Sequence, residues 1–331
     1  MMAFVVPDQL AIDRGPSTSL AAEVKGFARS LGFDLVGIAR ADAPEHADYF
    51  RQWLAAGRHG EMAYLANRAE ERADPGKYLP GARSVICVAL NYYAPLEPVA
   101  DADRPHHGRV ARYALGDDYH EIIKGRLYDL ADWLRERAGG ETRCGVDTAP
   151  VMERELHARA GVGWVGKNTC VIHPQAGSWI LLGEVLTTLE LPADAPMTDH
   201  CGTCTRCLDA CPTGALTAPY ELDATRCISY LTIEHRGEIA PDLRPLIGDW
   251  LYGCDVCQDV CPHNARVPVA TDPALKPRFP TGTLDVRQVG AWTEEEYRPA
   301  LRRSAMKRVK LPQLRRNAQV VRENTERARS Q

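Results

Sequence analysis

The cysteine residues constrain this chain more than any other feature of its sequence. Eleven cysteines occur among the 331 residues, and eight of them lie between Cys201 and Cys261. The first run has the spacing C-x-x-C-x-x-C-x-x-x-C-P, and a shorter run, C-x-x-C-x-x-x-C-P, follows it. Short C-x-x-C steps let one loop place several thiolates around one inorganic centre, so this window predicts a metal-binding segment. The eight residues are Cys201, Cys204, Cys207, Cys211, Cys227, Cys254, Cys257 and Cys261.

Two 4Fe–4S clusters need eight thiolates, and the first run has the spacing of bacterial two-cluster ferredoxins. In those proteins the cysteine before the proline ligates the other cluster. This crossover assigns the first cluster to Cys201, Cys204, Cys207 and Cys261, and the second to Cys211, Cys254, Cys257 and Cys227. Zinc is the alternative, but paired zinc knuckles are usually separated by a longer loop, and disulfide frameworks are typical of small secreted domains. We expect the other three cysteines, Cys87, Cys144 and Cys170, to be core residues.

Composition indicates an ordinary globular protein, with 45% hydrophobic and 25% charged residues. No apolar run is long enough to span a membrane, and the free thiols favour the reducing cytoplasm. The net charge is −4, which argues against indiscriminate binding to nucleic acid. Residues 297–331 nevertheless contain eleven Lys or Arg against two acids. This basic segment is either a solvated helix face or the contact surface for a polyanion.

Apolar periodicity predicts a mixture of helices and strands that does not alternate strictly, so we expect an α+β, or irregular α/β, fold. We predict a flexible leader over 1–19, a catalytic domain over 20–195, a double-cluster ferredoxin-like domain over 196–265 and a basic helical segment over 266–331. Within the catalytic domain, helices are predicted over 20–32, 44–56, 61–73, 119–138 and 151–160. Strands are predicted over 33–38, 83–90, 142–146 and 178–189, with a loop over 94–108.

Two local features of the catalytic domain could carry chemistry. Residues 161–168 are rich in glycine, so they form either a turn or a loop that approaches a large ligand. Asp147 follows a predicted strand and precedes a proline. It could cap the next helix, or, if buried, its raised pKa would let it donate a proton. No G-x-G-x-x-G follows a strand and no Walker loop occurs, so a nucleotide-driven reaction finds no support.

Together these segments resemble one family, the epoxyqueuosine reductases, over about residues 20–320. The resemblance implies a cobalamin-dependent enzyme that reduces the epoxide of epoxyqueuosine at the wobble position of tRNA, the last step of queuosine biosynthesis. It also implies a corrinoid-reductase-like N-terminal domain and an external low-potential electron donor. The stretches that carry the match are Gly60–Leu65, Leu79–Ile86, Ala111–Ala114, Gly116–His120, Val146–Arg154 and Gly163–Asn168, with the full cysteine pattern.

The resemblance also implies roles for particular residues. Asp147 matches the family's proton donor, which an epoxide oxygen needs as its C–O bond breaks. The basic segment would grip the phosphates of the anticodon arm through Lys307, Arg308, Lys310, Arg315 and Arg316. The expected cobalamin contacts are Arg72, Ala111, Asp147, Lys167, Asn168, Val171, His173, Ser178, Gly253 and Cys254.

Two other functions share some of these features. A corrinoid reductive dehalogenase, or another small-molecule reductase, would share the clusters and the corrin domain but would not need a basic C-terminal segment. A simple electron carrier would not need a folded domain of this size before the cysteines. We therefore expect a monomeric, cytoplasmic enzyme that acts on tRNA.

Overall fold

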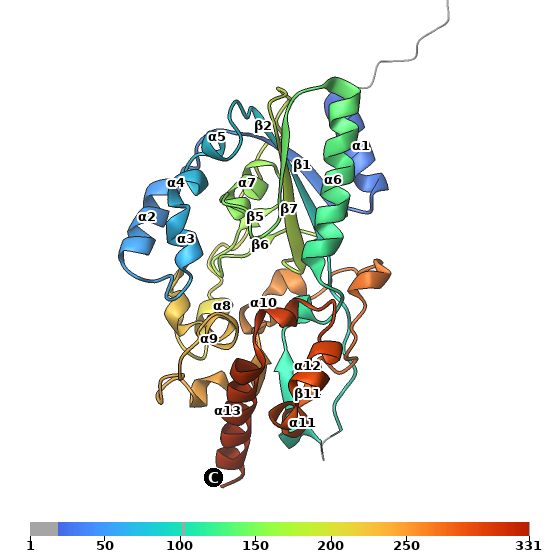
Figure 1. Cartoon of the computed structure of the whole chain (residues 1–331). Coiled ribbons are helices and arrows are strands. Elements are labelled where there is room, and N and C mark those ends of the chain that lie inside the picture. The colour runs from blue at the N-terminus through green and yellow to red at the C-terminus, as the bar shows by residue number, and fades with distance from the viewer. Residues whose placement is uncertain (1–18, 101–102, 331) are drawn as a thin grey trace, which may run out of the picture.

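The computed structural model describes residues 19–100 and 103–330; the predicted leader, apart from Ser19, lies outside these ranges. A four-stranded antiparallel sheet organises the N-terminal part, in the order β1-β2-β7-β4. Helices α1 and α6 contact the sheet and lie together on one side of it, and α7 lies on the other side (Figure 1). Because both faces are covered, every residue of β2 is buried. The elements are α1 (Leu20–Ser30), β1 (Leu35–Arg40), β2 (Ser84–Asn91), α6 (Tyr119–Ala138), β4 (Thr142–Gly145), α7 (Glu153–Arg159) and β7 (Ile180–Thr187).

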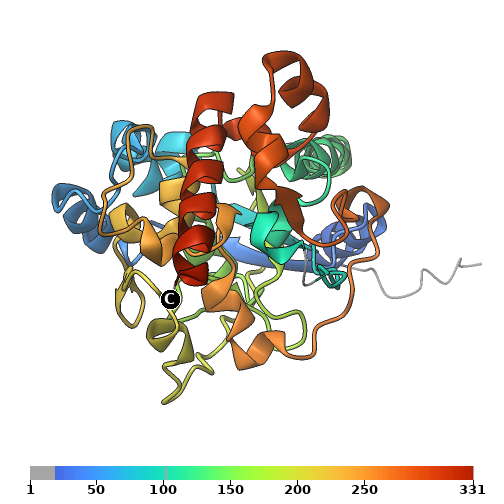
Figure 2. The ribbon, with the colours of Figure 1, turned by 90° about the horizontal axis from the view of Figure 1, so that it is seen from below.

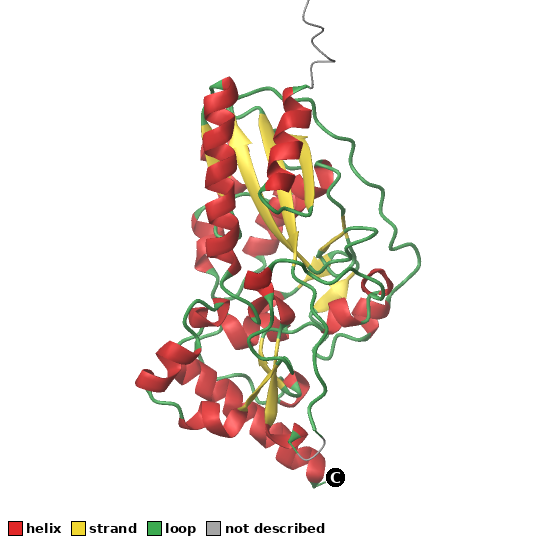
Figure 3. Ribbon diagram, turned by 90° about the vertical axis from the view of Figure 1, so that its right-hand side faces the viewer, coloured by secondary structure: helices red, strands yellow, loops and turns green. Residues whose placement is uncertain are grey.

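A second sheet joins segments that are far apart in the sequence. Strand β3 (His107–Val110) lies between β10 (Trp250–Tyr252), to which it is parallel, and β11 (Thr283–Asp285), to which it is antiparallel. These strands come from the predicted catalytic, cluster and C-terminal segments respectively. Figure 3 shows the larger sheet with its helices in the upper part and the helix-rich remainder below. The domain boundaries stay a prediction, but the three segments share this sheet.

The C-terminal segment is helical, as its sequence predicts. It contains α11 (Val286–Ala291), α12 (Glu294–Ala300), the 3₁₀ turn η7 (Ala305–Arg308) and α13 (Leu311–Arg329). Helix α13 packs on β10 and α9 (Ile228–Ile233), and Figure 2 shows it beside the segment that carries the cysteines. The buried Asn317 amide fixes this packing, because it donates to the Thr232 carbonyl at 2.8 Å and to the Leu251 carbonyl at 3.0 Å.

The cysteine segment contains only short elements, because its backbone is arranged as loops around the thiols. In the described ranges, no helix is both long enough and apolar enough to cross a membrane. The remaining elements between β7 and β11 are α8 (Arg206–Asp209), β8 (Leu216–Ala218), β9 (Glu221–Leu222), η3 (Ala224–Arg226), η4 (Pro245–Ile247), α10 (Val256–Asp259), η5 (Pro262–Asn264) and η6 (Pro273–Leu275).

Most predicted elements are confirmed, and the mixed α+β class with them, but two predictions are wrong. The helix expected over 61–73 breaks into α3 (Ala63–Asn67) and α4 (Ala69–Arg72), and Asp74 then caps the further turn α5 (Pro75–Tyr78) instead of ending the helical run. The expected loop over 94–108 ends in η1 (Arg104–His106) and the start of β3. Four further short elements are α2 (Ala47–Ala55), η2 (Arg112–Ala114), β5 (Trp164–Val165) and β6 (Val171–Ile172).

Candidate active site, cluster sites and basic groove

The eight cysteines of the window form two groups of four. The first group lines one cavity, next to Pro262. Burial raises the pKa of Cys207, and the nearby thiols of Cys201 and Cys261 raise it further. Burial also raises the pKa of Cys261, to which the thiols of Cys201 and Cys204 add. The first group is therefore Cys201, Cys204, Cys207 and Cys261.

The second group surrounds Cys257. A hydrogen bond with Cys170, then burial, and then the thiols of Cys227 and Cys254 raise the pKa of Cys257. Burial raises the pKa of Cys227, and the nearby Cys211 thiol adds to it. The grouping is the one that the ferredoxin crossover predicts, so the residues present fit two 4Fe–4S clusters.

The three cysteines outside the window differ in their surroundings. Cys87 is fully buried in β2, and the Cys144 thiol donates to the Leu127 carbonyl at 3.4 Å, so both are packing residues as predicted. Cys170 is different. Its hydrogen bond with Cys257 lowers the pKa of the Cys170 thiol to about 7, so Cys170 lies beside a predicted cluster ligand. Sequence periodicity gave no sign of this position.

The glycine-rich segment after α7 holds the cysteine loops in place. The Lys167 ammonium donates to the carbonyls of Gly202 at 2.6 Å and Cys204 at 3.1 Å, which places it against the loop of the first cluster. The buried Asn168 amide donates to the Cys257 carbonyl at 3.3 Å. Lys167 and Asn168, two of the residues predicted to contact cobalamin, thus form hydrogen bonds with the loops that carry the window cysteines.

Ser178 and its neighbours hold the second cysteine run from the other side. The buried Ser178 hydroxyl accepts from the side chains of Asn264 at 2.9 Å and Gln258 at 3.1 Å. His173 Nδ1 accepts from the backbone of Ala176 at 3.2 Å, and burial lowers the pKa of His173. Val171 is buried in β6. These residues shape the loop that ends at β7.

Gly253 brings the second cluster loop against the end of β3. Its φ is +68°, and a β-carbon added there would lie 2.5 Å from the Ala111 β-carbon and 3.6 Å from the Tyr113 ring. The Gly253 amide donates to the Thr232 hydroxyl at 2.9 Å. Only a glycine fits this close approach, which brings together Ala111 and Gly253, two of the residues predicted to contact cobalamin.

Asp147 occupies a tight turn between β4 and α7. Its φ is +47°, in the left-handed region that few residues other than glycine adopt. Its carboxylate accepts from the Tyr119 hydroxyl at 3.2 Å and pairs with His120 Nε2 at 3.1 Å. Met152, and not Asp147, is the N-cap of α7, so the helix-capping alternative is wrong. The side chain remains 55% exposed, which leaves the carboxylate accessible.

The charges around this site favour a protonated His120 beside an ionised Asp147. Although the Asp147 side chain is 55% exposed, the surrounding protein partly desolvates it and raises its pKa; the hydrogen bonds from His120 and Tyr119 and the charge of His120 outweigh this effect and lower the pKa below its usual value. Burial lowers the pKa of His120, but the carboxylates of Asp118 and Asp147 raise it to about 9. The raised pKa expected of a buried Asp147 is not found, because the side chain is exposed and paired with His120. Two hydrogen-bond donors, one of them charged, stabilise the ionised carboxylate.

Two further carboxyl groups, the partly buried Glu153 and the buried Glu184, interact with the charge of Asp147. Burial and then the charge of Asp147 raise the pKa of Glu153 to about 7. Glu184 of β7 is fully buried with no hydrogen-bond partner for either oxygen among the described residues, and burial raises its pKa well above the usual value. It faces Gly145, where a β-carbon would lie 2.2 Å from the Glu184 carboxylate. Arg72 is also buried and donates to the Ala149 carbonyl at 2.8 Å, so it supports the turn after Asp147.

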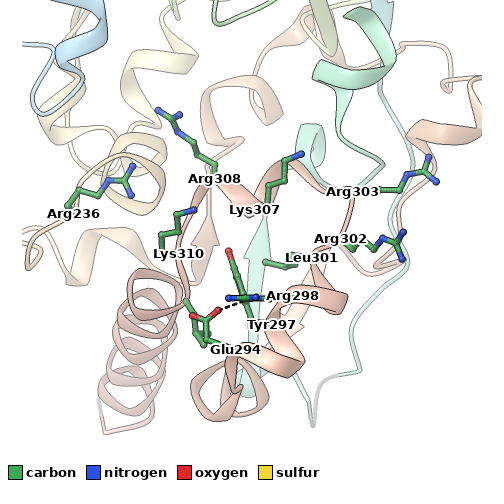
Figure 4. A pocket seen from close by; sticks show the side chains of 11 residues that line it. Arg236, Glu294, Tyr297, Arg298, Leu301, Arg302, Arg303, Lys307, Arg308 and Lys310 are labelled. Carbon is green, nitrogen blue, oxygen red and sulfur yellow. Dashed lines mark hydrogen bonds and ion pairs between the residues drawn. The ribbon is translucent and has the colours of Figure 1, made fainter. Parts of the chain in front are cut away.

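Basic side chains line a groove of about 810 Å³ beside α12 and η7 (Figure 4). Arg308 pairs with Glu234 at 2.8 Å, and its guanidinium lies 5.6 Å from the centre of the exposed Tyr64 ring. We call this surface the basic groove. Its basic residues are Arg236, Arg298, Arg302, Arg303, Lys307, Arg308 and Lys310.

Two of the residues predicted to bind RNA lie outside the lining of the basic groove. The Arg316 guanidinium donates to the carbonyls of Leu231 at 2.7 Å and His235 at 2.9 Å, and burial lowers its pKa. Arg315 donates to the Trp292 carbonyl. Arg316 thus fastens α13 to the cysteine segment, whereas the exposed Arg315 bonds to the residue that ends α11. Charge counting cannot distinguish a structural arginine such as Arg316 from an exposed one.

Comparison with known proteins decides the family. Residues 72–148 match the family model described as "Epoxyqueuosine reductase QueG, DUF1730", and residues 200–264 match the "4Fe-4S double cluster binding domain". The chain is 42% identical over 298 residues to the epoxyqueuosine reductase of Pseudomonas aeruginosa, which covers 88% of this chain and 82% of that protein. This chain belongs to the epoxyqueuosine reductase family.

Solved structures of the family agree with this assignment. A crystal structure of epoxyqueuosine reductase with an epoxyqueuosine-modified tRNA-Tyr stem loop has a TM-score of 0.84 and 31% identity, covering 93% of this chain and 82% of that one. A Bacillus subtilis family member, whose catalytic aspartate loop is swung out of the active site, gives the same values. The predicted family, the oxidoreductase class and the double 4Fe–4S domain are confirmed.

Sequence reasoning missed several residues of the site. His120 and Tyr119 lie in the stretch that carries the family resemblance, but only their position at the start of α6 shows that they contact Asp147. Asp118 directly precedes the predicted helix over 119–138, and nothing in the sequence indicates that it also pairs with His120. Arg236 reaches the basic groove from the loop after α9, which no local signal indicates.

Proposed function

We propose that this protein reduces the epoxide of epoxyqueuosine at the wobble position of a tRNA, which completes queuosine. The reaction consumes two electrons and two protons, breaks both C–O bonds of the epoxide, forms the ring C=C bond and releases water. Family membership supports the chemistry. The relative crystallised with an epoxyqueuosine-modified stem loop supports the RNA substrate.

One observation carries the proposal: a single residue, Tyr113, separates the acidic site from the loop of the second cluster. Its ring lies 6.0 Å from the Tyr119 ring, centre to centre, and Tyr119 donates to Asp147. On its other side, Tyr113 is the neighbour of Gly253. A reduction that couples electrons to protons needs its two sources close together, so this arrangement supports the proposal.

Asp147 is the residue we assign as the proton donor. An epoxide oxygen leaves poorly as an alkoxide, so protonation must accompany cleavage of the C–O bond. The carboxylate is accessible, and its strained turn is typical of a functional site. The catalytic aspartate loop of the Bacillus subtilis relative supports this role.

We also propose that cobalamin binds between Asp147 and the second cluster. Contacts predicted from separate segments converge on the loop over 253–258: Ala111 meets Gly253, Asn168 meets Cys257, and Ser178 meets Gln258. The residues present therefore fit a cofactor that spans this neighbourhood. When bound, cobalamin would supply a cobalt centre that passes single electrons from the clusters to the epoxide. The 147–151 turn, held by Arg72, would close the opposite side.

The basic groove is the surface we propose for the anticodon arm, because seven cationic side chains there can replace counterions at RNA phosphates. The modified base would have to leave the stack to reach Asp147. We propose a monomeric enzyme in the cytoplasm, where its tRNA substrate and a low-potential electron donor are both present.

An anaerobic assay tests this function. Protein with reconstituted clusters and added cobalamin would be incubated with a reductant and tRNA that carries epoxyqueuosine, followed by mass analysis of the nucleosides. We expect the modified nucleoside to lose one oxygen atom, and we expect no loss when either the reductant or cobalamin is omitted. Unchanged epoxyqueuosine with fully loaded protein would refute the proposal.

A further inference from the structure

A line of three polar side chains connects the basic groove to Asp147. Lys307 Nζ lies 2.7 Å from one Asp118 carboxylate oxygen, and the other oxygen lies 2.8 Å from His120 Nδ1. His120 Nε2 then lies 3.1 Å from the Asp147 carboxylate. Lys307 lies in the basic groove (Figure 4) and is half exposed, whereas the Asp118 side chain is only 5% exposed. The line therefore runs from the surface, through a buried carboxylate, to the accessible acid.

We propose that Lys307, Asp118 and His120 form a positioning relay that stores the proton delivered by Asp147 and links its supply to docking of the RNA. This inference rests on the proposed function. In the delivery step, the N–H proton of His120 passes to the Asp147 carboxylate, and the carboxylic acid so formed gives that proton to the epoxide oxygen as its C–O bond breaks. His120 becomes neutral and recovers a proton from solvent, so the two electrons still come from the external reductant.

The geometry explains why the proton is held on His120. The imidazole lies in the first turn of α6, where the helix dipole disfavours a cation. Two carboxylates on opposite ring nitrogens overcome this effect, as in other sites where a carboxylate fixes the orientation of a histidine. The ring also stacks on Tyr119, at 4.0 Å between centres, which fixes its plane.

Charged and titratable groups from several elements face the relay. His120 faces Asp118 at its own helix start and Asp147 from the β4–α7 turn. Asp147 also meets Tyr119 and the charge of Arg154, and Glu153 lies beside it. Lys307 faces Asp118 and, more weakly, Glu121.

The link to RNA follows from competition for Lys307. A phosphate in the basic groove would draw Lys307 away from Asp118, whose charge would then act on His120 alone. His120 would hold its proton to a higher pH, so a docked substrate would find the relay loaded. The C-terminal segment that carries Lys307 is also held near the start of α6 by Asp117, which pairs with Arg303 at 2.6 Å and with Arg278 at 2.7 Å.

Three substitutions separate this role from a structural one. Asp118→Asn retains an N-cap side chain for α6 but removes the charge, so His120 should lose its proton at lower pH. Lys307→Met removes the competing cation, so His120 should lose its proton at higher pH. Lys310→Met is the matched control, because it removes one charge from the same groove and no ion pair of Lys310 is found among the described residues.

Two measurements, a histidine titration and a pH profile of the turnover rate, distinguish these variants. Histidine NMR titration of the cluster-loaded protein, with His120 assigned by its absence in His120→Gln, should show a wild-type midpoint near the pKa of about 9, lower in Asp118→Asn and higher in Lys307→Met. The single-turnover rate should fall with rising pH at these same midpoints. Lys310→Met should raise KM for the RNA and keep the wild-type midpoint. His120→Gln should slow turnover by roughly 10²-fold with little change in KM.

The relay would be refuted if the His120 titration midpoint were the same in all variants, or if His120 of the wild type titrated near pH 6.5. The proposed function would stand in that case, because it depends only on turnover by the wild-type protein. Absence of wild-type turnover alongside the expected NMR midpoints would instead refute the function and leave the relay as a charge device of the fold.

Discussion

The Gly253 α-carbon lies so close to Ala111 that a β-carbon on Gly253 would come within 2.5 Å of the Ala111 β-carbon. This contact seats the loop of the second cluster on the end of β3. It also brings Cys254 toward Tyr113, whose ring contacts Tyr119, the hydrogen-bond partner of Asp147. The absence of a side chain at Gly253 therefore sets how close the second-cluster loop lies to Asp147.

Gly253→Ala should therefore damage the site more than a simple backbone effect would. We expect it to lower the free energy of unfolding by roughly 2–4 kcal/mol, through strain at positive φ and displacement of the loop. The matched control is Gly248→Ala, because Gly248 also has positive φ, +62°, but has nothing within 4 Å of an added β-carbon among the described residues. If thermal unfolding showed the same loss of stability in Gly253→Ala and Gly248→Ala, the close approach of Gly253 to Ala111 would not explain the effect.

Asp147→Asn should abolish turnover while the clusters and the fold remain. Asn accepts the same hydrogen bonds but cannot relay a proton, and removal of a general acid typically costs roughly 10²- to 10⁴-fold in rate. The single-turnover rate with modified tRNA, together with iron content, measures this. Asp285→Asn is a suitable control, since Asp285 caps α11 and pairs with Arg287. A wild-type rate in Asp147→Asn would exclude the proton-donor role.

Cys227→Ala should reduce the iron content by about four of the eight atoms that two cubane clusters hold. The second group has no other cysteine in its crossover pattern to complete it. Cys87→Ala should keep all the iron, because Cys87 is a packing residue of β2. Iron analysis and electron paramagnetic resonance of the reduced protein measure both. An unchanged iron content in Cys227→Ala would mean that Cys170, next to Cys257, supplies the missing ligand.

Removal of charge from the basic groove should weaken binding of the tRNA stem loop and reduce its salt dependence. For Arg302→Gln with Lys310→Gln, the slope of log affinity against log salt should fall by roughly one for each RNA phosphate that the protein no longer neutralises. Arg322→Gln with Arg329→Gln removes the same charge from exposed positions of α13 outside the groove. If both double variants bind alike, net charge and not the groove governs affinity.

The stability of the folded protein should depend on pH through His120. Its pKa is raised from 6.5 to about 9, so the stabilisation is fully present below pH 6.5 and is lost as the pH rises through 9. Urea unfolding of the wild type and of His120→Gln at pH 6.5 and pH 9 would give the change in the free energy of unfolding for each protein, and the difference between the two changes measures the contribution of His120. We expect the wild type to lose more stability than the variant, and parallel losses would contradict the pairing with Asp118 and Asp147.

The sequence predicts best those features that depend on local spacing. The cluster cysteines follow from C-x-x-C steps, and α6 follows from its periodicity and the Asp118 cap. Strand β2 follows from a continuous apolar run. Each of these patterns reflects a constraint within one segment, so a single sequence is enough to reveal it.

Features that depend on distant contacts were missed or misjudged. Strand β3 is extended because β10 and β11 pair with it, although its own residues lie in a polar stretch. The pKa of Asp147 is lowered, because α6 supplies His120 and Tyr119. Arg316 is structural because α13 lies on the carbonyls of the loop after α9. Local composition carries none of this information.

The sheet formed by β10, β3 and β11 has a consequence for synthesis of the protein. Strand β3 emerges from the ribosome long before either of its partners, and α13, which covers β10, is translated after both. The interior around the second cluster therefore cannot close until α13 has been made. Insertion of iron and sulfide at an earlier stage would meet an open, incomplete site, so we expect cluster assembly to follow synthesis of α13.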